Sequence, residues 1–66
     1  MAVESIPVRL SGDGRVATWN PALTRAAHVH VEVLLADGEV ATRRTMNSGR
    51  ARVREDERIQ RVFVEE

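Results

Sequence analysis

Residues 28–46 read HVHVEVLLADGEVATRRTM, two alternating runs with a turn signal between them. In the first run, 28–35, apolar and polar residues alternate until the last positions, which is typical of a half-buried β-strand. Asp37-Gly38 is a strong hairpin signal, and residues 39–46 provide the returning strand. This stretch therefore predicts an antiparallel hairpin.

Two registers are open to this hairpin. A two-residue turn places Leu35 opposite Val40 and Glu32 opposite Arg43, which is a favourable cross-strand charge pair. A three-residue loop instead opposes the inward valines of the first strand with Thr45, Arg43 and Ala41. The second arrangement leaves much of the apolar face unused, so we predict the two-residue turn. A slip of one residue would send every side chain to the other face of the sheet.

A second hairpin is predicted near the N-terminus. Residues 6–10 read IPVRL and form a strand at a sheet edge, because proline has no backbone N–H for a ladder. The sequence SGDG at 11–14 predicts a tight turn, and 15–19 is the returning strand. With a two-residue loop Ile6 faces Trp19, which pairs an aromatic with a β-branched side chain.

A short helical connection follows the second strand. Asn20 is suited to the N-cap and Pro21 to the first helical position, which predicts one or two turns near residues 21–27. Leu23 is the large apolar residue of this segment, and we expect it to cover one end of the core.

The C-terminal part can form strands or a helix. As strands, 50–54 and 58–64 flank an acidic loop, 55–57, whose three carboxylates are expected to be hydrated. As a helix, a segment capped by Asp56 would place Ile59, Val62 and Phe63 on one face. Because Val-Phe-Val favours strands, we predict strands. The chain is thus expected to be a single small all-β domain, residues 1–66: an antiparallel meander or barrel of five or six short strands, of SH3-like or OB-like size.

The composition excludes several classes of protein. The 66 residues include ten arginines, ten acidic residues, no lysine and no cysteine. Disulfide scaffolds, thiolate enzymes and classical zinc fingers are therefore excluded, and no apolar run or leader pattern indicates a membrane span or a secretion signal. The aromatic residues are Trp19 and Phe63 alone. A domain this small buries only about 60% of its unfolded surface, so we expect it to gain stability from a partner.

Catalytic and metal-binding constellations are incomplete. His28, His30 and Glu32 lie on one face of the predicted strand, and two imidazoles with a carboxylate could begin a metal site. The sequence has no other histidine and no cysteine to complete it, so no metal and no cofactor are predicted, although binding at these three residues stays open. No phosphate loop or activated nucleophile is present, and we expect no enzymatic activity.

Positive charge is concentrated in one segment. Residues 43–61 contain seven arginines and three acids, although the whole chain has zero net charge. As a strand, this segment presents Arg50, Arg52 and Arg54 on one face, about 7 Å apart, a spacing that could follow a phosphate backbone. Residues 14–20 resemble the opening strand of cold-shock domains, but the aromatic RNA-binding strands of that family have no counterpart, so no function is implied.

These observations favour a non-enzymatic protein-interaction or assembly module. Arginine is enriched at protein interfaces and lysine is depleted there. The module is expected to bind a protein partner or to form an oligomer, in the cytoplasm or within a macromolecular assembly; a small structural subunit of a phage particle is one example. The alternative is a small-barrel nucleic-acid-binding protein that uses the arginines. The predicted partner contacts are Trp19, Arg43, Arg44, Arg50, Arg52 and Arg54.

Overall fold

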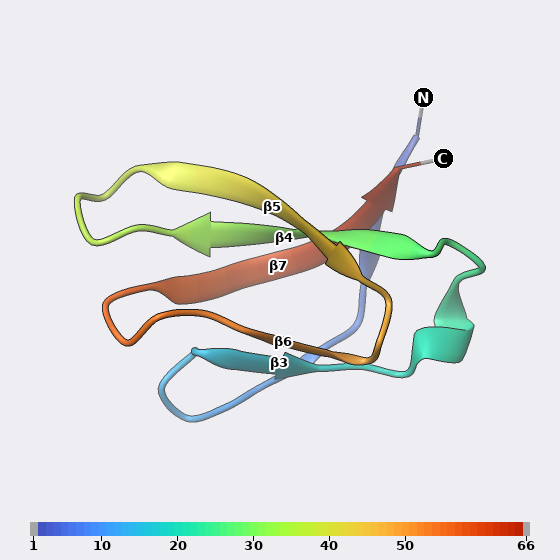
Figure 1. The fold of residues 1–66 in the computed structure, drawn as a ribbon, viewed down its shortest axis with the longest axis horizontal. Coiled ribbons are helices and arrows are strands. Elements are labelled where there is room, and N and C mark those ends of the chain that lie inside the picture. Colours follow the sequence, from blue (N-terminus) through green and yellow to red (C-terminus); the bar gives the residue numbers. More distant parts are fainter. Residues whose placement is uncertain (1, 66) are drawn as a thin grey trace.

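The computed structural model describes residues 2–65 as two antiparallel sheets (Figure 1). The first sheet has the order β1–β7–β4–β5 and the second has the order β2–β3–β6. The all-β prediction is confirmed, as an open meander rather than a closed barrel, and no helix of the described residues is long and apolar enough to cross a membrane. The strands are β1 (Val3–Ile6), β2 (Arg9–Leu10), β3 (Val16–Thr18), β4 (His28–Leu34), β5 (Val40–Met46), β6 (Arg50–Arg52) and β7 (Arg58–Glu65).

Pro7 divides the predicted first strand between the two sheets. Before it, β1 pairs with β7 and places Ile6 opposite Val62. After it, β2 pairs with β3 and places Leu10 opposite Ala17. The predicted pairing of Ile6 with Trp19 is therefore wrong, because a residue that cannot donate to a ladder allows the chain to leave one sheet and enter the other.

The loop between β2 and β3 is longer than predicted. The Ser11 hydroxyl accepts hydrogen bonds from the backbone N–H groups of Arg15 and Val16, at 3.2 and 3.1 Å. The Ser11 N–H donates to the Val16 carbonyl at 2.9 Å, and Gly14 turns the chain with a φ of +71°. A serine hydroxyl that competes for backbone groups in this way favours a wider turn than a two-residue hairpin loop.

The central hairpin has the register that the sequence analysis rejected. Val31 lies opposite Arg43, and Glu32 lies opposite Thr42. The Leu35 N–H donates to the Glu39 carbonyl, and Gly38 has a φ of +86°, the geometry of a three-residue loop closed by a glycine in the left-handed region. The predicted two-residue turn and the Glu32–Arg43 pair are therefore wrong.

The C-terminal segment forms strands, as predicted, with a bulge in β7. Glu32 of β4 lies opposite Arg61 and the next residue, Val33, lies opposite Ile59, so Gln60 is left without a partner in the ladder. This extra residue lets Ile59 and Val62 both point into the core although they are three positions apart. The spacing that also suggested a helix is the result of this bulge.

The predicted helical connection is a single 3₁₀ turn, η1 (Pro21–Leu23). The Asn20 side chain accepts a hydrogen bond from the Ala22 N–H at 3.0 Å, so the predicted N-cap is confirmed. The turn ends at Thr24, which has extended backbone. Leu23 is 51% exposed and is not part of the core, in contrast to the prediction.

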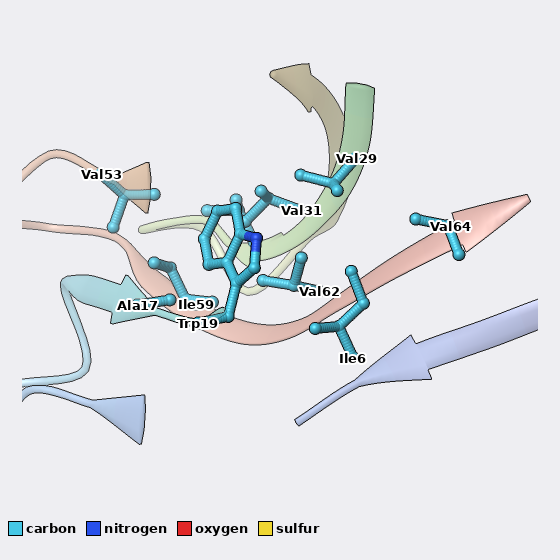
Figure 2. Packing of buried hydrophobic residues seen from close by; sticks show 10 residues of the cluster. Ile6, Ala17, Trp19, Val29, Val31, Val53, Ile59, Val62 and Val64 are labelled. Carbon is cyan, nitrogen blue, oxygen red and sulfur yellow. The ribbon is translucent and has the colours of Figure 1, made fainter. Parts of the chain in front are cut away.

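The core lies between the two sheets and surrounds Trp19 (Figure 2). The Trp19 ring packs among valines and isoleucines of the first sheet, and its N–H donates to the Asn47 side-chain oxygen at 2.8 Å. Phe63 is also buried, but it is outside this cluster. The cluster consists of Ile6, Ala17, Trp19, Val29, Val31, Val33, Val53, Ile59, Val62 and Val64.

Candidate functional site

The strands β5 and β6 are end strands of different sheets, and a short turn at residues 47–49 joins them (Figure 1). β5 is hydrogen-bonded to β4 and β6 to β3. Between these two sheet edges lies a groove of about 270 Å³. The open side of the meander is therefore a groove bordered by two strands that are next to each other in the sequence.

The groove combines an apolar floor with a basic rim. Its valines belong to the core cluster or its edge, and its arginines come from both bordering strands. Four of the six predicted contact residues line this groove; they were predicted from the concentration of arginines in 43–61. The lining residues are Val31, Val33, Val53, Ala51, Thr45, Arg43, Arg44, Arg50 and Arg52.

An ion pair links one of the groove arginines to the loop between β6 and β7. Arg43 of β5 donates two hydrogen bonds to the carboxylate of Glu57, which lies between β6 and β7, at 2.8 and 2.6 Å. The Glu57 side chain is 8% exposed and that of Arg43 is 47% exposed. The Arg54 N–H adds a third hydrogen bond to this carboxylate, at 3.2 Å. The expectation that the acids of 55–57 are hydrated is therefore wrong for Glu57.

These hydrogen bonds keep both partners of the ion pair charged. The Arg43 guanidinium lowers the pKa of the Glu57 carboxyl below its ordinary value, and the Arg54 N–H acts in the same direction, whereas burial opposes them. The carboxylate in turn raises the pKa of Arg43. The bidentate contact neutralises one of the four arginines that line the groove, so Arg50 and Arg52 carry its net positive charge, while the Arg44 guanidinium lies on the outer face beside His28.

Asn47 holds the turn that closes the other end of the groove. Its side-chain oxygen accepts the Trp19 N–H, and its side-chain nitrogen donates to the carbonyls of Pro21 and Ala26, at 3.0 and 3.1 Å. Gly49 follows with a φ of +89°, and a Cβ there would meet the Trp19 carbonyl oxygen at 3.0 Å. The turn between β5 and β6 is thus attached to the core and to η1.

The structure separates two predicted contact residues from the groove. Trp19 is 9% exposed and packs in the core, so it presents little surface to a partner. Arg54 is exposed, but it is not among the lining residues. The candidate site therefore keeps the arginines of β5 and β6 and loses its predicted aromatic anchor.

The predicted metal-site residues share the outer face of β4, but each has another partner. The His30 ring stacks on Phe63 with 5.3 Å between centroids, and Arg61 lies over the same phenyl ring. Glu32 accepts a hydrogen bond from Arg61 at 2.9 Å, and His28 Nδ1 lies 3.3 Å from an Arg44 nitrogen. Within residues 2–65, no group of three or more His, Asp or Glu side chains converges as a metal site.

A larger hollow of about 480 Å³ lies between η1 and the ends of β1 and β7. Glu4 and Glu65 bring two carboxylates to it, and Arg25 brings one guanidinium. The exposed Leu23 is its most apolar side chain. Because its charges are mixed, whereas the charged residues that line the groove between β5 and β6 are all arginines, the groove is the stronger candidate.

Two features of the groove were not recognised in the sequence. In the sequence, nothing distinguishes Glu57 from the neighbouring acids Glu55 and Asp56. Asn47 has the residue type and the position of an ordinary turn residue. The signal for Glu57 was Arg43: in the rejected register its side chain points to the same face as the core valines, where it can pair with a carboxylate that is itself buried. For Asn47 the sequence held no comparable signal, because its partners come from segments 21 to 28 residues away.

Comparisons with protein families, with curated proteins and with solved structures found no match to this chain.

Proposed function

We propose that this chain is a non-enzymatic protein-interaction module and that the groove between β5 and β6 binds an acidic region of a partner protein. The observation that carries the proposal is a groove whose floor is made of core valines and whose β6 border carries the exposed Arg50 and Arg52. Arg44 adds positive charge at the β5 border, with its guanidinium on the outer face beside His28. Guanidinium groups bind carboxylates through two parallel hydrogen bonds, and the apolar floor favours the carbon stems of side chains. Assembly into a larger particle, such as that of a phage, in the cytoplasm would use the same surface.

The distribution of charge supports a protein partner over a nucleic acid. One of the four groove arginines is already neutralised by Glu57, and the chain as a whole has no net charge. Both aromatic side chains are buried, Trp19 at 9% and Phe63 at 6% exposed. Single-strand binders combine positive charge with exposed aromatic rings on which bases stack, and neither ring offers such a surface.

The test compares two polyanions on the ¹⁵N-labelled protein. We expect a polyglutamate peptide to shift the amide signals of β5 and β6, and we expect Arg50→Glu to weaken this binding by about tenfold or more. Arg25→Glu is the matched control: it makes the same charge change on an exposed residue outside the groove, and it should leave the affinity within about twofold.

A thymidine oligonucleotide tests the alternative. Stronger binding of the oligonucleotide than of polyglutamate, with a steep loss between about 50 and about 200 mM salt, would support nucleic-acid binding instead. Binding of neither probe, or an equal loss in the Arg50 and Arg25 variants, would refute the proposed groove.

A further inference from the structure

We infer that the partner segment binds in extended form, as a strand added to the free edge of β5, with acidic side chains directed to the arginines of the groove. This inference rests on the proposed function and specifies the conformation and the pattern of the partner. Its evidence is the hydrogen-bonding pattern of β5, its length and its charge.

The backbone pattern shows which groups β5 offers. The Asn47 N–H donates to the Ala27 carbonyl at 2.9 Å. Hydrogen-bonded and non-hydrogen-bonded residues alternate along an antiparallel pair, so in the observed register Arg43 bonds to β4, whereas the N–H and C=O groups of Thr42 and Arg44 point away from it. Within the part of the chain that the structure describes, no strand pairs with that side of β5.

The free edge of β5 is better suited to strand addition than that of β6. β5 has seven residues and β6 has three. The outward carbonyl of Arg50 in β6 already accepts a hydrogen bond from the Ser48 hydroxyl at 3.2 Å. Val40 and Met46, at the two ends of β5, are 52% and 69% exposed and offer apolar contacts to an added strand. An edge that is long, unpaired and flanked by apolar side chains is a ready template for another strand.

The arginines on and near β5 indicate which kind of strand can pair with its free edge. Two copies of β5 paired antiparallel would bring Arg43 and Arg44 of one copy close to those of the other, and like charges across a ladder destabilise it. Arg44, on the outer face of β5, and Arg50 and Arg52 across the groove favour a strand with carboxylates, whereas Arg43 is already paired with Glu57. The expected partner is therefore an extended segment in which acidic residues alternate with apolar ones, rather than a second copy of this chain.

The probe is a capped heptapeptide of alternating valine and glutamate with a fluorescent label, and the measurement is fluorescence anisotropy. Two further versions carry N-methyl groups on the odd or on the even amides. Only one set of amides can face β5, so one version should bind about tenfold or more weakly while the other keeps most of the affinity.

A protein variant tests the same hydrogen bonds from the other side. Thr42→Pro removes an outward N–H from an edge strand, where proline is tolerated, and should weaken binding of the unmodified heptapeptide by about threefold or more. Thr42→Val keeps the N–H and should bind as the native chain does. Circular dichroism checks that both variants retain the sheet.

The outcomes separate the two proposals. If Arg50→Glu weakens binding but both N-methylated peptides and Thr42→Pro bind normally, the acidic groove stands and strand addition is refuted. If the heptapeptide does not bind at all although polyglutamate does, strand addition is likewise refuted. A molar mass by light scattering of twice the 7.4 kDa chain or more, at the concentrations used, would overturn the exclusion of a second copy.

Discussion

Asn47 connects the turn of the groove to the core, and its replacement gives the sharpest test of the fold. Asn47→Ala removes four hydrogen bonds: three short ones, of 2.8, 3.0 and 3.1 Å, to Trp19, Pro21 and Ala26, and a long one of 3.5 Å to the Thr24 carbonyl, which adds little to the three. At about 1 kcal/mol for each short bond, their loss should lower the free energy of unfolding by about 3 kcal/mol. A domain of this size has about 3 to 10 kcal/mol in total, so the variant should melt roughly 12 to 24 °C lower.

Asn47→Asp tests separately the hydrogen bond that Asn47 accepts and the hydrogen bonds that it donates. The carboxylate can still accept the Trp19 N–H, but it cannot donate to the carbonyls of Pro21 and Ala26. We therefore expect a loss of about 2 kcal/mol or more, because the carboxylate oxygen that replaces the amide nitrogen cannot donate and is repelled by these carbonyl oxygens. The exposed Ser48, which has one side-chain bond of 3.2 Å, provides the control: Ser48→Ala should cost less than about 0.5 kcal/mol.

Urea denaturation followed by tryptophan fluorescence measures these differences, because Trp19 is the only tryptophan and is buried. Equal slopes against urea for all variants would show that the comparison is one of stability. The reasoning fails if Asn47→Ala lies within about 0.5 kcal/mol of the native chain, or if Asn47→Asp is as stable as asparagine.

Two further predictions concern the ion pair and the turn. Because Arg43 holds the pKa of Glu57 below the ordinary value of 4.5, the ion pair stabilises the fold above that pH and this contribution is lost as the pH falls through the lowered pKa. Thermal melts between pH 7 and pH 2 should therefore show an acid-dependent decrease that is smaller in Glu57→Gln, which is already less stable at neutral pH; an unchanged pH profile in the variant contradicts the assignment. Gly49→Ala should cost about 1 to 3 kcal/mol, because the backbone is left-handed there and a Cβ would crowd the Trp19 carbonyl. Gly12→Ala, where the space is open and no left-handed φ is required, is the control and should melt close to the native chain.

The groove explains why an arginine can occupy an inward position of β5. Glu57 is the buried member of the Arg43–Glu57 ion pair, and a buried carboxylate without a counter-ion would be costly. The bidentate contact with Arg43, which is half exposed, offsets this cost and joins β5 to the loop between β6 and β7. Among residues 2–65, the other arginines that line the groove form no ion pair with a carboxylate. Positive charge, an apolar floor and a free strand edge therefore coincide at one place in the molecule.

The local pattern of residues determined the class of fold and most of its strands. The alternating valines of 28–34 and the Val-Phe-Val run within 58–64, together with the turn signals between strands, were sufficient to predict short antiparallel strands, because strand preference and turn chemistry act over a few neighbouring residues. The exposure of the arginines in 50–54 followed from the same alternation.

The tertiary structure alone decided the registers, the division into two sheets and the site. The register of β4 and β5 depends on whether Arg43 finds a carboxylate fourteen residues away, and the path after Pro7 depends on which sheet has a strand to pair with. The burial of Trp19 depends on Asn47, twenty-eight residues further on. Each of these contacts forms only when distant segments pack together, so the pattern of residues around one partner does not identify the other partner.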